Sequence, residues 1–154
     1  MNKKEKVFIT GSSGGIGGAI TKKFNDSGYE LILISSSKEK LETLKKSYGN
    51  HHSYYQLDLS DVSNISSKME EIVNKHPDIS IIVNNAGLTS DSLLLRMKFE
   101  QWQKVINTNL TSNFAIIKSI LPNMLKNKNG KIIGISSVVA LSGNPGQANY
   151  VSSK

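Results

Sequence analysis

Tyr150 and Lys154 are the two side chains whose types and spacing most directly suggest a reaction. Residues four apart on a helix lie on the same face, one turn from each other. A phenol can give up a proton and take it back, and an ammonium beside it favours the charged phenolate. The pair is therefore a candidate general acid. Tyr-x-x-x-Lys arises easily by chance in a lysine-rich chain, so other positions have to support this interpretation.

Three more polar side chains stand where such a reaction could use them. Ser136 and Ser137 follow an apolar run, and Ser137 precedes Tyr150 by 13 positions. A hydroxyl at the end of a buried strand can orient a substrate carbonyl, or it can simply be solvated. Asn109 interrupts an apolar stripe, and a buried amide must find hydrogen-bond partners. These positions are candidate hydrogen-bond donors for the reaction.

A glycine-rich turn at residues 10–17, TGSSGGIG, predicts a phosphate-binding site between a strand and a helix. Gly11 allows the tight turn, Gly15 lets the backbone approach a pyrophosphate, and Gly17 permits close packing of helix on strand. The free N–H groups at the start of the helix attract phosphate. The alternative is a tight strand-to-helix turn with no ligand.

Five short apolar or β-branched runs must position these residues. Continuous runs of this length are typical of parallel strands that are covered on both faces. The predicted strands are 6–10, 31–34, 53–57, 79–83 and 131–135.

Amphipathic helices are predicted between the strands, with a further helix starting near Gln147. This alternation predicts one α/β domain over residues 1–154, a doubly wound parallel Rossmann-type sheet in three α/β/α layers. That fold usually has six strands, so the domain is expected to be incomplete at its C-terminus. The apolar stripes are Ile16, Ala19, Ile20 and Phe24, ended by Gly28; Leu41, Leu44 and Tyr48; Val62, Ile65, Met69, Ile72 and Val73; and Trp102, Val105, Ile106, Leu110, Ile117 and Leu121.

The order of the motifs resembles that of the short-chain dehydrogenase/reductase family. After the glycine-rich turn come the motif NNAG at 84–87, then Asn109, Ser137 and the pair Tyr150 and Lys154. Within that family, residues 84–98 and 137–150 are similar to the 3-oxoacyl-[acyl-carrier-protein] reductases. The resemblance covers essentially the whole chain but only the N-terminal part of a family member.

The resemblance implies NADPH-dependent reduction of a 3-oxoacyl chain to the 3-hydroxyacyl form in fatty acid biosynthesis. It implies acyl carrier protein as partner, a cytoplasmic location and a homotetramer. Tyr150 would donate the proton, Lys154 would also hold the nicotinamide ribose, and Ser137 and Tyr150 would bind the substrate. Asn109 would anchor a water-based proton relay, a role compatible with a structural one in a kinked helix. The implied cofactor-binding residues are Gly11, Ser12, Ser13, Gly14, Gly15, Ile16, Gly17, Ser36, Asp58, Leu59, Asn85, Ala86, Gly87, Tyr150 and Lys154.

The end of the second predicted strand favours NADP over NAD. Family members that use NAD usually carry a carboxylate there, which bonds the ribose 2′-hydroxyl. Residues 35–38 read SSSK, so nothing repels a 2′-phosphate, and Ser36 and Lys38 are expected near it. Gly14 departs from the pattern, because many NADP-dependent relatives have a basic residue there. Asp58 and Leu59 match the position that contacts adenine.

Composition excludes several classes of protein. The absence of cysteine excludes a disulfide framework and fits a reducing cytoplasm. No apolar run reaches the roughly 20 residues that cross a bilayer, and nothing at the start resembles a signal peptide. The net charge of +7 comes from lysines spread along the chain and a single Arg96, which argues against a nucleic-acid interface.

Two groups of charged or titratable residues have simple interpretations. His51, His52 and His76 lack the spacing of metal ligands, so they are expected at the surface and no metal site is predicted. A lysine cluster either docks an acidic carrier protein or is solvated at a helix end. The cluster is Lys126, Lys128 and Lys131.

Two other functions remain open on the sequence. One is a short-chain dehydrogenase/reductase that acts on another small alcohol or ketone. The other is a dinucleotide-binding sensor without catalysis, although the presence of all four catalytic positions argues against it.

Overall fold

Five parallel strands form one sheet in the computed structural model, which describes residues 5–154. Their order across the sheet is β3-β2-β1-β4-β5, and every neighbouring pair is parallel. The predicted doubly wound α/β fold and its five strands are confirmed. The strands are β1 (Lys6–Thr10), β2 (Glu30–Ser35), β3 (Ser53–Gln56), β4 (Ile79–Asn84) and β5 (Lys131–Gly134).

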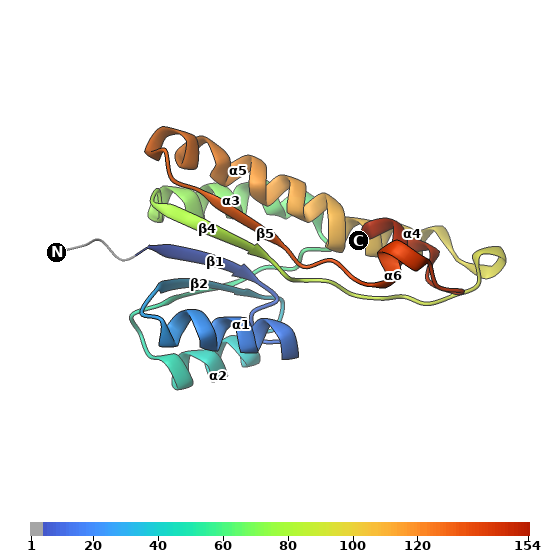
Figure 1. The fold of residues 1–154 in the computed structure, drawn as a ribbon, viewed down its shortest axis with the longest axis horizontal. Helices are drawn as coiled ribbons and strands as arrows, with labels where there is room; N and C mark the ends of the chain where they lie inside the picture. Colours follow the sequence, from blue (N-terminus) through green and yellow to red (C-terminus); the bar gives the residue numbers. More distant parts are fainter. Residues whose placement is uncertain (1–4) are drawn as a thin grey trace.

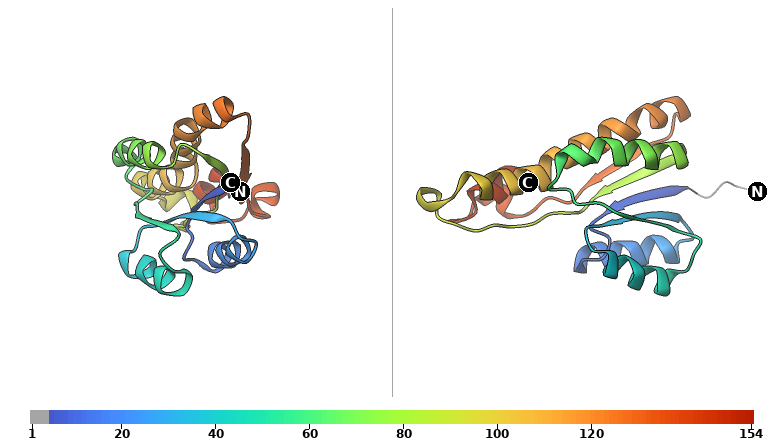
Figure 2. Two further views of the ribbon diagram at one scale, coloured as in Figure 1. Left: turned by 90° about the vertical axis from the view of Figure 1, so that its left-hand side faces the viewer. Right: turned by 180° about the vertical axis from the view of Figure 1, so that it is seen from behind.

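Helices cover both faces of this sheet, giving the three expected layers (Figure 1, Figure 2). Two helices pack on one face and two on the other, as right-handed crossovers between parallel strands require. The first pair is α1 (Gly15–Asp26) and α2 (Lys38–Tyr48); the second is α3 (Val62–Lys75) and α5 (Ser112–Asn127).

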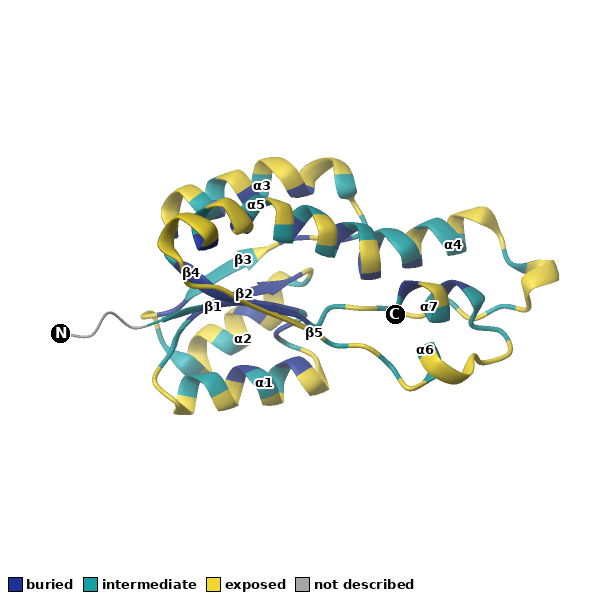
Figure 3. Ribbon diagram, turned by 45° about the horizontal axis from the view of Figure 1, so that its top comes forward, coloured by how far each residue is buried: buried dark blue, intermediate teal, exposed yellow. Residues whose placement is uncertain are grey.

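The core lies on both faces of the central strands, whose side chains alternate between the two layers. Phe8 and Ile32 belong to the cluster that includes α3 and α5. Val7 and Leu33 belong to the cluster against which α1 and α2 pack. Figure 3 shows the buried residues concentrated along the sheet, while the outer sides of the helices are exposed. Packing within these two clusters holds the strands in place, and the candidate functional site lies at the carboxyl ends of those strands.

The remaining helices gather beyond the carboxyl ends of the strands (Figure 1). The helix predicted near Gln147 begins at Ala148, and it packs against α4. No helix within residues 5–154 is long and apolar enough to cross a membrane. These elements are η1 (Leu94–Arg96), α4 (Phe99–Ile106), the π-helical turn η2 (Asn107–Thr111), α6 (Val139–Ser142) and α7 (Ala148–Ser153).

The apolar stripe predicted for the first helix is wrong at its start. Ile16 and Ala19 are exposed, whereas Gly17 and Thr21 are buried. The Thr21 hydroxyl donates a hydrogen bond to the carbonyl of Ser12 at 3.2 Å. Small residues face the strand here because α1 lies too close to the turn for larger side chains.

The stripe predicted for the longest helix is also displaced. Leu110 and Leu121 are exposed, while Thr108, Asn109 and Ser112 are buried. The Asn109 and Ser112 side chains on this buried side hydrogen-bond to backbone groups, so polar residues are buried here. A pattern of apolar residues therefore points to the wrong side of the helix. Further along α5 the buried side chains are Ile116, Ile120 and Met124.

Two histidines that were expected at the surface are buried. His52 accepts a hydrogen bond from the Leu31 amide at Nδ1 (3.2 Å), and its Nε2 lies 3.0 Å from Asn25 Oδ1. His76 Nε2 lies 2.9 Å from the Tyr55 hydroxyl. Burial, together with the nearby Lys6, lowers the pKa of His76 below its usual 6.5. Both rings serve packing, which local sequence does not reveal.

His76 is expected to make the protein less stable in mild acid. Because its pKa is lower in the folded state, only the unfolded chain binds the proton as pH falls below 6.5. Stability is then lost down to the folded-state pKa, at up to about 1.4 kcal/mol per pH unit. Urea unfolding between about pH 7.5 and pH 5.5 measures the slope. His76→Gln should flatten it, and the exposed His51 provides the control His51→Gln; equal slopes in all three proteins would contradict the assignment.

Candidate functional site

A cleft of about 590 Å³ opens at the carboxyl ends of β1, β2 and β4. Its volume is in the range of sites that bind small molecules and cofactors. It lies where the strand order reverses between β1 and β4, the usual ligand position in open α/β sheets. Its lining residues are Gly11, Ser13, Gly14, Gly15, Ile16, Gly17, Ile34, Ser35, Ser36, Lys40, Leu57, Asp58, Leu59, Asn85, Ala86, Gly87, Leu88 and Thr108.

The glycine-rich turn forms one wall of this cleft and has no room for side chains at two positions. Gly11 has a φ of +62°, and a Cβ there would lie 2.9 Å from the Ala86 Cα. A Cβ at Gly17 would lie 2.0 Å from the Gly11 carbonyl oxygen. Ser12 is buried and its hydroxyl donates to the Ile34 carbonyl at 3.1 Å, so its side chain lies outside the cleft.

The NNAG motif holds the turn in place. The Asn85 side-chain amide donates to the carbonyls of Thr10 (3.0 Å) and Gly11 (3.1 Å). In return, the Thr10 hydroxyl accepts hydrogen bonds from the amides of Asn85 and Ala86, both at 3.0 Å. The two segments are 75 residues apart in sequence, and this network fixes the cleft wall before any ligand binds.

The second wall comes from the end of β2 and from residues after β3. Ser36 lines the cleft. Lys38, which was expected near a 2′-phosphate, does not line it, whereas Lys40 does. Asp58 also lines the cleft beside Leu59, and its Oδ1 accepts hydrogen bonds from the Ser60 amide (2.9 Å) and hydroxyl (2.8 Å). Of the two residues expected near a 2′-phosphate, the structure brings only Ser36 to the cleft.

Lys154 and Asn109 meet at Gly87, where the cleft ends. A Cβ on Gly87 would lie 3.2 Å from Lys154 Nζ and 3.4 Å from Asn109 Oδ1. Lys154 Nζ donates to the Ile135 carbonyl at 2.8 Å and lies 5.9 Å from the centre of the Tyr150 ring. Burial lowers the pKa of the Lys154 ammonium. Gly87 therefore lines the cleft and also lies beside the candidate catalytic residues Lys154 and Asn109.

The Asn109 side chain ties three elements together. Its Oδ1 accepts from the Leu88 amide at 2.9 Å, and its Nδ2 donates to the Leu88 carbonyl at 3.0 Å. The same Nδ2 donates to the Ser153 hydroxyl at 2.8 Å. Asn109 lies within the π-helical turn η2, and its own carbonyl accepts from the Asn113 side chain at 2.7 Å. The amide thus holds α7, which carries Tyr150, against the loop after β4.

The two adjacent serines after β5 have different environments. The Ser136 hydroxyl donates to the Lys154 carbonyl at 3.0 Å, so it is committed to the backbone. Ser137 is half-buried, and its hydroxyl has no hydrogen-bond partner among residues 5–154. The hydroxyl of half-buried Tyr150 likewise has none in that part of the chain. Ser137 and Tyr150 therefore retain free hydroxyls, although neither lines the cleft itself.

Comparison with known proteins assigns the family. The sequence model of the short chain dehydrogenase family matches residues 5–154. The chain belongs to this family.

Similar proteins in this short chain dehydrogenase family include curated bacterial enzymes. The chain is 43% identical over 149 residues to 3-oxoacyl-[acyl-carrier-protein] reductase FabG of Rickettsia felis, covering 96% of this chain and 59% of that enzyme. It is 44% identical over 158 residues to the enzyme of that name from Thermotoga maritima, covering 100% of this chain and 64% of that enzyme. The chain thus spans about 60% of the length of these relatives.

Solved structures of short-chain enzymes have the same fold. A metagenomic short-chain oxidoreductase in complex with NADP superimposes with a TM-score of 0.91 at 29% identity, covering 97% of this chain and 70% of that one. A short-chain dehydrogenase from Streptomyces avermitilis gives a TM-score of 0.93 at 21% identity, covering 100% and 57%, and shows the fold alone.

This short chain dehydrogenase also has cleft residues that the sequence did not single out. Thr108 lines the cleft, and its Oγ1 is buried without a hydrogen-bond partner in residues 5–154. Leu88 and Lys40 line it as well. Thr108 directly precedes Asn109, and Lys40 lies four residues beyond Ser36, so nearness in sequence to a predicted site residue was the available signal. Among the described residues no group of three His, Cys, Asp or Glu could hold a metal.

Proposed function

We propose that this short chain dehydrogenase reduces the ketone of a 3-oxoacyl chain carried on acyl carrier protein, using NADPH, in fatty acid biosynthesis. The observation that carries the proposal is the position of two candidate catalytic residues at the end of the cleft. Gly87 lines the cleft, and the side chains of Lys154 and Asn109 lie next to it. The similarity to enzymes named as 3-oxoacyl-[acyl-carrier-protein] reductases supports the substrate. We extend the proposal to a cytoplasmic homotetramer of the full-length protein.

The residues of the cleft fit a dinucleotide. The glycine turn leaves backbone exposed for a pyrophosphate, since Gly14 and Gly15 are exposed and side chains are absent there. The unpartnered Thr108 hydroxyl offers a polar contact inside the cleft. Asp58 and Leu59 would hold the adenosine end, and Lys154 would hold the nicotinamide ribose. When bound, NADPH supplies the hydride that the protein itself lacks.

The protein's own contribution is a proton and a fixed geometry. We assign the Tyr150 hydroxyl as the proton donor to the ketone oxygen, with the Lys154 ammonium stabilising the phenolate that remains. Ser137 would donate a hydrogen bond to the same oxygen and orient it. Asn109 would position this group, because its side chain already bonds Leu88 and Ser153.

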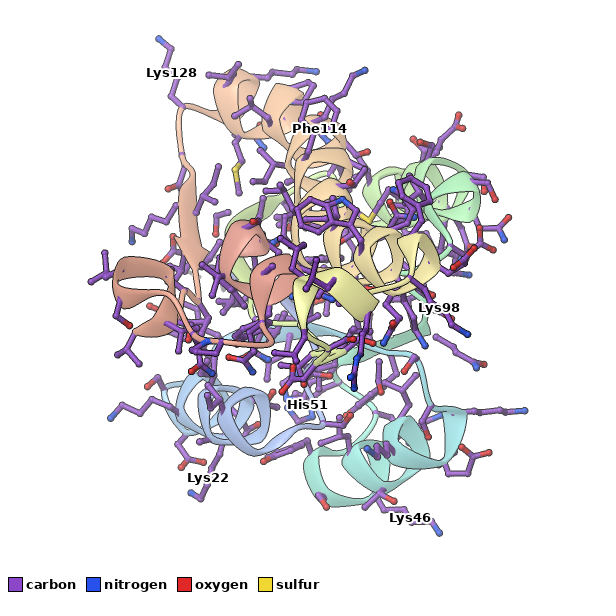
Figure 4. All side chains as sticks on the ribbon, turned by 90° about the vertical axis from the view of Figure 1, so that its right-hand side faces the viewer. Lys22, Lys46, His51, Lys98, Phe114 and Lys128 are labelled. Atoms are coloured by element: carbon purple, nitrogen blue, oxygen red, sulfur yellow. The ribbon has the colours of Figure 1, made fainter. Side chains whose placement is uncertain are left out.

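The lysine cluster does not enter the proposal. Lys126, Lys128 and Lys131 are exposed. They lie where α5 ends and β5 begins, at the opposite end of the sheet from the C-terminus marked in Figure 1. Lys128, like Lys22 and Lys46, extends away from the body of the molecule (Figure 4). This placement favours solvated lysines over a docking site that serves the chain's own catalytic group.

The direct test is NADPH oxidation by the full-length protein with an acetoacetyl thioester of acyl carrier protein. We expect turnover that requires both compounds, at a kcat in the range of about 1–1,000 s⁻¹ that is common for enzymes. Simple sugars and steroid ketones provide the comparison substrates. Faster turnover of one of these would replace the substrate while keeping the reaction class. Binding of NADPH without turnover of any ketone would instead indicate a sensor and overturn the proposal.

A further inference from the structure

Asn149 directly precedes Tyr150 and is wholly buried in the first turn of α7. Its side chain has an exposed fraction of 0%, whereas Tyr150 beside it is half-buried. Burying a carboxamide costs free energy unless its oxygen and nitrogen find hydrogen-bond partners. An apolar side chain could fill such a position without that cost, so we expect the amide to hold particular groups together.

Three segments of the chain meet at the Asn149 side chain. Its Oδ1 accepts a hydrogen bond from the backbone amide of Tyr150 at 2.8 Å. Its Nδ2 donates to the Ser90 carbonyl at 2.9 Å and to the Gln101 carbonyl at 3.4 Å. Ser90 belongs to the loop after β4 and Gln101 to α4, which lie 59 and 48 residues earlier in the chain. Asn149 therefore joins the start of α7 to two distant elements.

The position of Tyr150 depends on such contacts because α7 is short. It has six residues, too few for a helix that is stable by itself. The Tyr150 amide is among the first N–H groups of α7, which have no partner within a helix, and Asn149 supplies one. The Tyr150 hydroxyl has no hydrogen-bond partner in the part of the chain that the structure describes, so the backbone of α7 sets where that hydroxyl lies.

The other end of α7 is held separately. The Ser136 hydroxyl donates to the Lys154 carbonyl at 3.0 Å, and Lys154 Nζ donates to the Ile135 carbonyl at 2.8 Å. Asn109 reaches the Tyr150 carbonyl through the Ser153 hydroxyl, which accepts from Asn109 and donates to that carbonyl, both at 2.8 Å. Removing the Asn149 side chain would thus release the Tyr150 end of α7 and leave Lys154 in place.

The bonds that precede α7 do not replace this contact. The Ser92 amide donates to the Gly146 carbonyl at 2.8 Å, and Gln147 Nε2 donates to Asp91 Oδ2 at 3.1 Å. Both bonds lie before the first residue of α7, and water competes for the exposed Gln147 bond. Neither involves Tyr150 itself.

We infer that Asn149 positions the Tyr150 hydroxyl for proton transfer, by holding the first turn of α7 against Ser90 and Gln101. The inference rests on the proposed reduction of a ketone with Tyr150 as proton donor. Asn149 is a positioning residue, because its side chain bonds backbone groups and does not line the cleft. Its removal should lower the rate of the chemical step while the cofactor site stays intact.

The first test is the kcat of the full-length protein with NADPH and the acetoacetyl thioester of acyl carrier protein. Asn149→Ala should lower kcat about 100-fold, since a displacement of about 1 Å in a reacting group can cost that much. The dissociation constant of NADPH should stay within about 3-fold, because the glycine turn and Lys154 keep their contacts. Asn149→Ser, which leaves a polar group in the space, is measured as well in case the alanine variant does not fold.

Asn127→Ala is the matched control. Asn127 Nδ2 also donates to a distant backbone carbonyl, that of Pro77 at 3.2 Å, but it does so at the end of α5. Its kcat should stay within about 2-fold of the wild type. Circular dichroism verifies the fold of each variant, and the number of NADPH sites per chain corrects kcat for any unfolded protein.

A double-mutant cycle with Tyr150→Phe separates positioning from a general effect on the fold. If Asn149 acts through the Tyr150 hydroxyl, Asn149→Ala should lower kcat by less than about 3-fold once that hydroxyl is absent. Damage to the fold would lower kcat by the same factor in both backgrounds. Single turnovers with enzyme in excess make the slow double variant measurable. Equal factors in the two backgrounds would overturn the inference.

The outcomes also separate this inference from the proposed function. If the wild-type protein reduces no ketone, or if Tyr150→Phe keeps its kcat, the proposed function or its proton donor is wrong and the inference fails with it. If the wild type is active and Tyr150→Phe is not, but Asn149→Ala and Asn149→Ser keep the wild-type kcat, the inference alone is wrong.

Discussion

A Tyr150→Phe variant should reduce the acetoacetyl thioester about 1,000-fold more slowly than the wild-type protein, because removing a general acid typically costs that much. The change deletes one oxygen and keeps the aromatic ring. The Tyr150 hydroxyl has no hydrogen-bond partner within residues 5–154, so its loss leaves no buried group unpaired. The loss should therefore fall on kcat and leave the fold intact.

Steady-state kinetics measure the expected loss in kcat, and a titration with NADPH tests whether the cofactor site is unchanged. The dissociation constant for NADPH should stay within about 3-fold, since Lys154 and the glycine turn are unchanged. Tyr29→Phe is the matched control, because Tyr29 packs edge-on against Phe24 on the α1 side of the sheet. Retention of more than about a tenth of the wild-type kcat in Tyr150→Phe would remove Tyr150 from the proton transfer.

Gly17→Ala should destabilise the protein by about 3 kcal/mol and abolish dinucleotide binding. The new Cβ would lie 2.0 Å from the Gly11 carbonyl oxygen and 2.6 Å from the Asn85 side-chain nitrogen. The first of these atoms is backbone, so the turn itself has to move. That movement breaks the hydrogen bonds from Asn85 that hold the cleft wall.

Gly18 provides a matched control for this substitution. It is the next residue of α1, and a Cβ there would meet nothing within 4 Å. Gly18→Ala should raise the free energy of unfolding by about 0.5–1 kcal/mol, because alanine favours a helix more than glycine does. Urea unfolding followed by circular dichroism compares the two variants with the wild type. Equal stabilities for Gly17→Ala and Gly18→Ala would contradict the steric argument.

Sequence patterns predict the centre of the sheet well because β2, β1 and β4 are buried on both faces. The expectation that every strand is covered on both faces is wrong for β5, whose residues are all exposed. The run at 79–83 became β4 with one added residue, and the parallel pairing of the strands followed from their alternation with helices. The glycine turn and the NNAG motif were also found, since both require particular residue types at fixed spacing. Twelve of the 15 predicted cofactor residues line the cleft; Ser12, Tyr150 and Lys154 do not.

The failures all depend on contacts between distant segments. His76 is buried because Tyr55, 21 residues away, packs on it, and nothing in the local sequence indicates this. Lys38 and Lys40 are equally basic, and only the phase of α2 against β2 decides which one reaches the cleft. The polar face that includes Asn109 was misread because its partners, Leu88 and Ser153, belong to other elements.

The π-helical turn η2 has a consequence for insertions and deletions. Such a turn holds one residue more than an α-helical turn, so losing one residue there would leave α4 and α5 in their present relative rotation. A deletion within α5 would instead rotate everything beyond it by about 100°, exposing buried residues such as Ile120. Shortening η2 would thus spare the core but withdraw Asn109 from Leu88 and Ser153. Chain length at this turn is therefore constrained by the site and not by the fold.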